Sequence, residues 1–286
     1  MWRGLLTGDR DSAHVAVFGI ASDANCSIGR GAGEAPRVMR ECSEFLPPAT
    51  AGGTPLTPCM WDLGDVNGYC YDEVLAKHTA CADKPFTLVL GGDHSVSILS
   101  QKAYRSLHWG RIGIIHVDAH ADICDSYQNS TQSHACVNRR ALENGYDQQD
   151  IAMVGIRSYE LQEVEFLKDA AVKVYDADAV RGLGAAAVVA ELTEKFKGYD
   201  RIYLSFDIDA VDPAYAPGTG TPEHFGLTSL EVRTLLTGIV RSLPVTVMDV
   251  VEVAPPLDQN NVTTWLALKY ILEILNIIDQ KEKQHG

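Results

Sequence analysis

Three short motifs directly after apolar segments offer two histidines and, besides Asp93, four carboxylates. They are Gly91-Gly92-Asp93-His94, Asp118-Ala119-His120-Ala121-Asp122 and Asp207-Ile208-Asp209. In an extended chain, side chains two residues apart point to the same side, so the ligand-type residues at alternate positions of the second and third motifs are expected to project together. Open α/β sheets bind ligands beyond the carboxyl ends of their strands. The motifs therefore predict a polar site at such an edge.

The charge of these residues points to a metal site. Four carboxylates in one pocket repel one another and cannot all stay ionised unaided. Two divalent cations would balance them, and two-metal sites with the ions about 3.5–4 Å apart are a known hydrolytic device. The two imidazoles, many oxygens and absence of thiolate favour an ion such as Mn²⁺ over a cysteine-bound zinc. The alternative is that the aspartates end loops and the histidines are structural.

Composition narrows the class of protein. The chain has 286 residues, 46% of them hydrophobic, a net charge of −14 and a pI of about 5.0. Nucleic acids and anionic membranes are bound by basic patches, so neither is an expected partner. The seven cysteines are odd in number and include no C-x-x-C pair, which favours a cytoplasmic location. Cys124, beside the second motif, is either a reactive thiol or a small packed residue.

Neither end of the chain predicts a targeting or membrane segment. Met1–Arg10 lacks an apolar stretch of signal-peptide length. Val262–Ile278 is interrupted by Lys269, Glu273 and Asn276 and is too short to span a bilayer. We expect it to form an amphipathic helix packed against a sheet.

Apolar, β-branched segments alternate with helix-like segments along the chain. The predicted strands are His14–Ile20, Phe86–Leu90, Ile112–Val117, Ile151–Ile156, Val172–Tyr175, Arg201–Phe206 and Val245–Val250. The predicted helices are Ala35–Glu44, Asp72–Ala82, Ser95–Tyr104, Ala135–Asn144, Leu161–Asp169, Ala185–Phe196, Ser229–Arg241 and Val262–Ile278. This alternation indicates a parallel sheet covered on both faces. No linker or repeat divides the chain, so we predict one domain over residues 1–286.

Loops rich in glycine and proline separate some of these elements. Ala49–Cys59 is expected to be a surface loop. Asp212–Gly226 follows Asp209 directly, so we expect a pocket wall rather than an ordinary surface loop. The early glycines at 29, 31 and 33 lack the spacing of a dinucleotide-binding loop.

Together these motifs resemble those of the ureohydrolases, the arginase and agmatinase family, over nearly the whole chain. The matching segments are Gly31–Arg37, Leu90–Ser95, His116–Asp122, Ser133–Ala135, Ser205–Pro213, Pro217–Pro222 and Asp249–Pro255. The resemblance implies an arginase-like, three-layer α/β/α fold with a mainly parallel sheet. It also implies two Mn²⁺ per subunit and a homo-oligomer, either a trimer or a hexamer.

The resemblance also implies roles for the ligand-type residues. One Mn²⁺ would be held by His94 and Asp122, the other by His120 and Asp209, with Asp118 and Asp207 bridging them. His116 is expected behind the ligands, because the six better-matched residues already complete two sites. Asp93 and Asp125 are expected to orient ligands or cap turns.

Within the family, the chain is more similar to agmatinases than to arginases. Tyr127–Ala135 resembles the agmatinase pattern around the catalytic histidine, where arginases carry a longer insert. Glu223, after Thr221-Pro222, is also agmatinase-like. The chain departs from the usual pattern at Ala135, where glycine is frequent, and at His224-Phe225. Both departures lie near the expected pocket mouth and leave the exact substrate open.

The implied reaction is hydrolysis of a guanidinium group to urea and a primary amine, with the metals supplying hydroxide. His134 is the candidate for proton transfer to the leaving amine, because imidazole titrates near neutral pH. Glu252 is the candidate for binding the guanidinium, and Asp209 could hydrogen-bond the intermediate. Glu160 could face a distal amine of the substrate. The alternatives are a core histidine for His134, a structural ion pair for Glu252 and an exposed helix-start acid for Glu160.

The predicted activity is hydrolysis of agmatine to putrescine and urea, a step of polyamine biosynthesis with a small cationic guanidino substrate. Arginine, guanidinobutyrate, guanidine and formiminoglutamate are alternative substrates, but Asp212–Gly226 contains no Arg or Lys to bind a carboxylate tail. A two-metal phosphoesterase should offer basic residues to phosphate, whereas these loops are acidic. The remaining alternative is a non-catalytic, metal-stabilised regulatory subunit. Such a protein would be expected to lack a metal ligand, His134 or Glu252, but this chain has all of them.

Overall fold

An eight-stranded parallel sheet forms the centre of the structure, a computed structural model that describes residues 1–285. Along the sheet the strand order is β2-β1-β3-β8-β7-β4-β5-β6, and every neighbouring pair is parallel. The strands are β1 (Val15–Ala21), β2 (Met60–Asn67), β3 (Phe86–Leu90), β4 (Ile112–Val117), β5 (Ile151–Ile156), β6 (Lys173–Asp176), β7 (Arg201–Asp207) and β8 (Val245–Val251). All their carboxyl ends therefore lie at one edge of the sheet.

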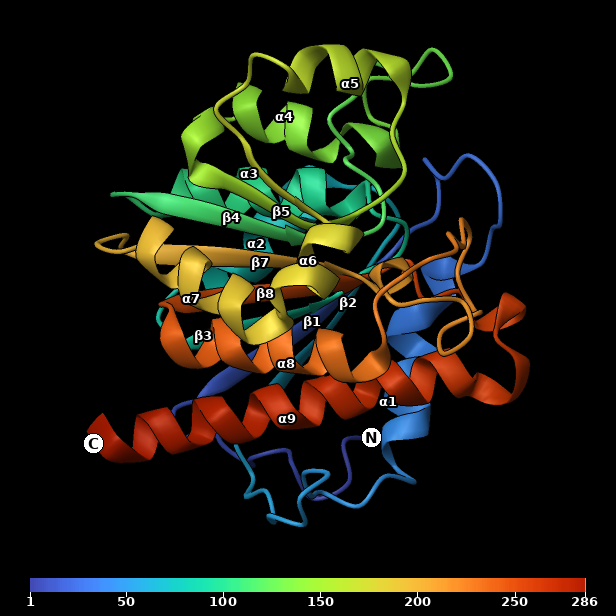
Figure 1. The fold of residues 1–286 in the computed structure, drawn as a ribbon. Coiled ribbons are helices and arrows are strands. Elements are labelled where there is room, and N and C mark those ends of the chain that lie inside the picture. Colours follow the sequence, from blue (N-terminus) through green and yellow to red (C-terminus); the bar gives the residue numbers. More distant parts are fainter. Residues whose placement is uncertain (286) are drawn as a thin grey trace.

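Helices cover both faces of the sheet, which gives the predicted three layers (Figure 1). One face packs against α1 (Ala35–Ser43), α6 (Ala177–Leu183), α7 (Ala185–Lys195), α8 (Ser229–Ser242) and α9 (Val262–His285). The other packs against α2 (Tyr71–Ala80), α3 (Val96–Leu107), α4 (Val137–Glu143) and α5 (Leu161–Leu167). Strands β3, β4 and β5 are buried along their whole length. They are continuous apolar segments because both of their faces are covered.

One strand and one α-helix were not predicted. Strand β2 is a half-exposed edge strand whose sequence, MWDLGDVN, contains two aspartates and Gly64 at φ 69°, so no apolar run marks it. Helix α6 is short, and the Asp176 side chain caps it by accepting from the Ala179 N–H. The predicted helix at Ala135–Asn144 begins with a 3-10 turn, His134–Cys136, before α4.

The C-terminal helix is longer than expected. Helix α9 extends past the predicted end at Ile278 to His285 and lies along the face that also carries α8 and α1 (Figure 1). Among residues 1–285, no helix has both the length and the apolar character needed to cross a membrane.

The strand order brings the three motifs together. Strands β3, β8, β7 and β4 are consecutive in the sheet although they are far apart in the sequence. The motifs follow β3, β4 and β7, and the segment after β8 begins with Glu252. Four neighbouring strand ends therefore deliver the candidate residues to one place.

Candidate metal centre and active site

The chain turns sharply where each candidate residue leaves its strand. After β4 it bends and reaches Asp122 at φ 50°, and after β8 it places Glu252 at φ 62°. Asp209 lies in a 3-10 turn, Ile208–Ala210. These residues do converge, but the predicted reason, alternation along an extended chain, is wrong. They converge because tight turns at the ends of adjacent strands direct their side chains toward the same place.

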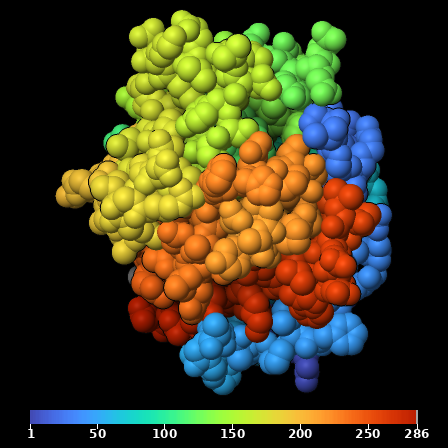
Figure 2. Space-filling model, turned by 45° about the vertical axis from the view of Figure 1, so that its right-hand side comes forward, coloured from blue at the N-terminus to red at the C-terminus, as the bar shows by residue number. Residues whose placement is uncertain are grey.

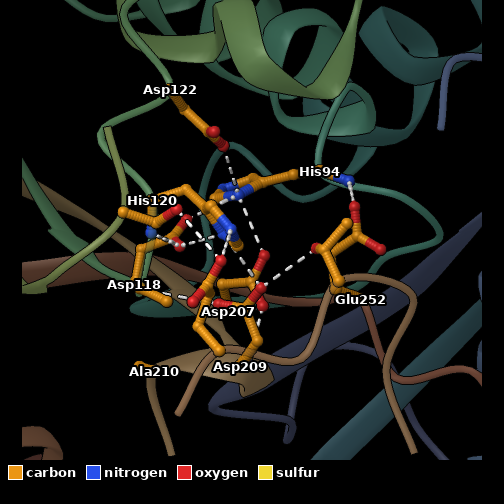
Figure 3. Close-up of polar contacts among 12 residues, drawn as sticks. His94, Asp118, His120, Asp122, Asp207, Asp209, Ala210 and Glu252 are labelled. Carbon is orange, nitrogen blue, oxygen red and sulfur yellow. Dashed lines mark hydrogen bonds and ion pairs between the residues drawn. The ribbon is translucent and has the colours of Figure 1, made fainter. Parts of the chain in front are cut away.

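His94 meets three carboxylates at the base of the site. Its Nδ1 lies 3.0 Å from Asp118 Oδ2, 3.0 Å from Asp122 Oδ2 and 3.2 Å from Asp207 Oδ2 (Figure 3). A single ring N–H can serve only one acceptor, and both His94 Nδ1 and Asp118 Oδ2 are buried without a well-formed hydrogen bond. Ring nitrogen and carboxylate oxygens that converge in this way fit a bound cation.

A second cluster shares Asp118 with the first. His120 Nδ1 lies 3.1 Å from Asp209 Oδ2 and 3.6 Å from Asp118 Oδ1. Asp118 thus turns one oxygen to each cluster (Figure 3). Asp207 turns Oδ2 to His94, while its Oδ1 accepts from the Asp209 N–H at 2.8 Å. The structure therefore brings together all six residues to which ligand roles were assigned.

The electrostatics of these clusters also fit cations. Burial, followed by the charges of Asp209 and Asp118, raises the pKa of Asp207 well above its ordinary value. Burial likewise raises the pKa of Asp209 despite the opposing charge of His120. Burial by itself would lower the pKa of His94, but hydrogen bonds to Asp118 and two further carboxylates raise that pKa well above 6.5. Carboxylates that resist ionisation together are stabilised by a metal ion, so the residues present fit such an ion.

A buried hydrogen-bond chain orients His94. Its Nε2 lies 2.9 Å from Ser205 Oγ, which donates to Asp249 Oδ1 at 2.8 Å. Asp249 Oδ2 accepts from Ser97 Oγ and Tyr203 OH, each at 2.7 Å. The chain keeps the proton on Nε2 and leaves Nδ1 free for a metal. The roles of Ser205 and Asp249 were not predicted, although a lone carboxylate inside the apolar β8 was a usable signal.

His116 lies beside His94 and Asp118, and its ring nitrogen belongs to the same group of possible ligand atoms. Its ring stacks on His94 with centroids 5.0 Å apart. Its Nε2 is 3.0 Å from Asp118 Oδ2 and 3.1 Å from the His120 carbonyl oxygen. His116 therefore supports the loop that carries two of the candidate ligands.

His134 and Glu252 contact each other beside the clusters. Glu252 is 2% exposed, and its Oε1 accepts from the His94 N–H at 2.8 Å and lies 3.3 Å from His134 Nδ1. Burial alone would lower the pKa of His134, but the hydrogen bond and charge of Glu252 outweigh it and raise that pKa to about 8. Ser27 Oγ, which was not predicted, lies 2.9 Å from His134 Nε2. His134 can therefore hold or release a proton near neutral pH.

A cavity of about 300 Å³ opens over His120, Asp122 and His134, whereas Glu252 does not line it. Its lining comprises Ser27, Ile28, His120, Asp122, Tyr127, His134, Ala135, Ser158, Tyr159, Glu160, Glu163, Thr221, Pro222 and Glu223. Figure 2 shows the contributing stretches side by side on one face, in blue, green, yellow-green and orange. The lining contains four carboxylates, those of Asp122, Glu160, Glu163 and Glu223, and no Lys or Arg. This composition suits a cationic ligand.

Some predicted residues lie at the rim or outside the cavity. Glu160 lines the rim, where its side chain also takes part in the capping box of α5. His224 and Phe225 are exposed and do not line the cavity, so the structure places only Ala135 of the unusual positions against it.

The minor predictions have mixed outcomes. Asp93 accepts from the backbone N–H groups of Asn25 and Ser95, in agreement with a capping role. The expectation that Asp125 orients ligands is wrong, because its exposed side chain pairs with Arg139. Burial raises the pKa of the Cys124 thiol, which supports packing rather than thiolate reactivity.

The chain belongs to the arginase family, whose sequence profile matches residues 13–276. Guanidinobutyrase from Pseudomonas aeruginosa is 31% identical over 94% of this chain and 87% of that protein. Mitochondrial guanidino acid hydrolase from Homo sapiens is 35% identical over 91% of this chain and 77% of that protein. The crystal structure of agmatine ureohydrolase from Thermoplasma volcanium superposes with a TM-score of 0.82, at 31% identity, covering 96% of this chain and 93% of that one.

These similarities define the class of protein. The chain is a hydrolase of the arginase family, which acts on guanidino compounds, and it carries a buried His/Asp cluster able to bind metal. The relatives differ in the group at the far end of the guanidino substrate, so they do not by themselves identify the substrate of this chain.

Proposed function

We propose that this chain is a binuclear manganese amidinohydrolase that converts agmatine and water to putrescine and urea. The residues proposed to hold two Mn²⁺ per subunit are His94, Asp118, His120, Asp122, Asp207 and Asp209. The proposal includes a cytoplasmic homo-oligomer, trimeric or hexameric, as the resemblance to the family implies.

The observation that carries the substrate proposal is the charge of the cavity. Glu160, Glu163 and Glu223 line it beyond the metal cluster, and no Arg or Lys does. A substrate with a carboxylate tail would leave that tail facing these acids without a cation, which is unfavourable in a partly buried site. The primary ammonium of agmatine is favoured there for the same reason.

The chain's own residues can perform the remaining steps. Two cations held by the six candidate ligands would supply hydroxide from water at neutral pH. Glu252 binds the N–H fork of the substrate guanidinium and holds its carbon over the clusters. His134, whose pKa is raised to about 8, carries a proton at neutral pH and gives it to the amine nitrogen as its bond to the guanidinium carbon breaks. The products are then urea and a primary amine.

A guanidino acid hydrolase is the second candidate. Two of the similar proteins are named guanidinobutyrase and guanidino acid hydrolase, and each is more than 30% identical to this chain. Their names favour a carboxylate tail, against the charge of the cavity seen here.

A panel assay tests the proposal. The Mn²⁺-loaded protein is incubated with agmatine, arginine, guanidinobutyrate, guanidine and formiminoglutamate, and urea is measured, with formamide for the last. Strong turnover of agmatine with putrescine as the second product supports the proposal. Turnover of guanidinobutyrate instead supports the second candidate. Inactivity on all five, with two metals bound, contradicts both.

A further inference from the structure

Arg157 links the two loops that carry candidate ligands, after β4 and after β7, to segment 223–226, which we call the wall segment of the cavity. It follows β5 directly, and its backbone N–H donates to the Ala119 carbonyl at 2.8 Å, within the loop that carries Asp118 and His120. Its half-buried side chain extends the other way, toward the loop after β7 and the wall segment 223–226.

The guanidinium of Arg157 donates only to backbone carbonyls. The acceptors are His224 O for Nε at 3.0 Å, Gly155 O and Ala210 O for Nη1 at 3.2 and 3.3 Å, and Asp209 O and Glu223 O for Nη2 at 2.7 and 2.9 Å. A guanidinium has five N–H groups, so these five bonds use all of them. Within residues 1–285, no carboxylate forms an ion pair with Arg157. This cation is therefore saturated and has no N–H left for a substrate carboxylate.

The bonds of Arg157 join one candidate ligand to one wall residue. Nη2 alone donates to the carbonyl oxygens of both Asp209 and Glu223. The side chain of Asp209 faces His120, and Glu223 lines the cavity. The Glu223 side chain accepts from Ser158 Oγ at 3.1 Å and lies 3.8 Å from His120 Nε2. The position of this carboxylate above the metal cluster thus depends on where Arg157 holds its backbone.

Besides Arg157, the side chains of Asp212 and Arg181 hold the backbone of the wall segment, and the Gly226 N–H donates to Asp212 Oδ2 at 2.8 Å. Phe225 is 82% exposed with φ 61°, a conformation that is unfavourable for a bulky side chain. Gly226 has no room for a Cβ, which would lie 2.7 Å from Arg157 Nη2. From the outer side, Arg181 donates to the carbonyls of Phe225 and Gly226 but to neither Asp209 nor Glu223. Of these side chains, Arg157 is the one that ties the Glu223 backbone to the loop that carries Asp209.

We infer that Arg157 is a positioning residue for substrate specificity, which acts by fixing the Glu223 carboxylate where the distal ammonium of the substrate binds. The inference rests on the proposed function for the identity of the tail. An arginine is required because five carbonyls on several chain segments must be reached from one planar group, and the three N–H of a lysine radiate from a single atom.

Arg157→Lys tests the inference with two matched substrates. Agmatine and butylguanidine have the same four-carbon chain, and only agmatine has the terminal ammonium. We expect the KM for agmatine to rise about tenfold, equivalent to the loss of one charged contact, with kcat changed less than about threefold. The KM for butylguanidine and the content of two Mn²⁺ should stay unchanged. Arg181→Lys is the control and should leave both KM values unchanged.

A double-mutant cycle with Glu223→Gln shows whether Arg157 acts through that carboxylate. If it does, Arg157→Lys raises the KM for agmatine in the wild type but hardly changes it in the Glu223→Gln background. Additive effects would contradict the inference, and so would equal losses with both substrates. Glu223→Gln alone should raise the KM for agmatine only, which tests the role of that carboxylate even if Arg157→Lys does not fold.

Hydrogen exchange provides a test that is independent of substrate. The amides of Asp212, Gly226 and Leu227 are bonded within the wall segment and its anchor, and they should exchange at least about tenfold faster in Arg157→Lys than in wild type. Unchanged exchange would refute the positioning role. If the wild type turns over no agmatine but exchange rises as expected, the proposed function fails and the structural part of the inference stands.

Discussion

Glu252→Gln is expected to lower kcat/KM for agmatine by about 10²–10⁴-fold without loss of metal. In the proposed complex the Glu252 carboxylate accepts two hydrogen bonds from the substrate guanidinium. Each charged hydrogen bond is worth about 1.5–3 kcal/mol, so the pair contributes about 3–6 kcal/mol, and 1.36 kcal/mol corresponds to a factor of ten. Glutamine keeps an acceptor oxygen for the His94 N–H, now 2.8 Å from Oε1, so the ligand should stay in place.

The assay combines steady-state urea release with metal analysis of the purified variant. Glu165→Gln is the control, since Glu165 is exposed on α5 and pairs with Lys168. That control should match the wild type in both measurements. A Glu252→Gln protein that binds two Mn²⁺ and keeps kcat/KM within about threefold of wild type would refute the assignment of Glu252 to the guanidinium.

Three further predictions concern metal, tail recognition and pH. Removal of Mn²⁺ with a chelator should lower the free energy of unfolding by about 2.7 kcal/mol per site relative to protein in metal at 100 times its Kd; an unchanged melting temperature would contradict the metal centre. Glu160→Ala should raise the KM for agmatine but not for butylguanidine, and an unchanged KM for agmatine would remove Glu160 from the substrate site. His78 is buried, and burial lowers its pKa from 6.5 to about 3. Between pH 6.5 and about pH 3, His78 therefore binds a proton in the unfolded chain but not in the folded protein. The free energy of unfolding falls as the pH is lowered through this window, by about 2 kcal/mol at pH 5. In His78→Gln, the loss of unfolding free energy between pH 7 and pH 5 should shrink by that amount, and an equal loss in both proteins would contradict this reasoning.

The layers of the fold could be predicted because the central strands are buried on both faces. Such strands must be apolar throughout, and β3, β4 and β5 were located to the residue for that reason. Strand β2 was missed because an edge strand tolerates aspartate and glycine. Helix α6 was missed because its seven residues are too few for a clear helical period.

The candidate ligands could be predicted from residue type and position after a strand, but their neighbours could not. The strand order β3-β8-β7-β4 makes Glu252 and Asp249 neighbours of His94, and this order is set by packing rather than by local sequence. The contact of Ser27 with His134 joins residues more than a hundred positions apart. The positioning role of Arg157 could not be predicted from the sequence, because its guanidinium donates only to backbone carbonyls, which every residue has.

The most direct test of the account compares kcat/KM for agmatine and for 4-guanidinobutyrate with the same Mn²⁺-loaded preparation. The two substrates carry the same guanidinium and differ in the charge of the tail. An acidic cavity without an available cation predicts that agmatine is preferred by at least about a hundredfold, equivalent to about 2.7 kcal/mol. A preference for 4-guanidinobutyrate would contradict the assignment of a cationic substrate to this site.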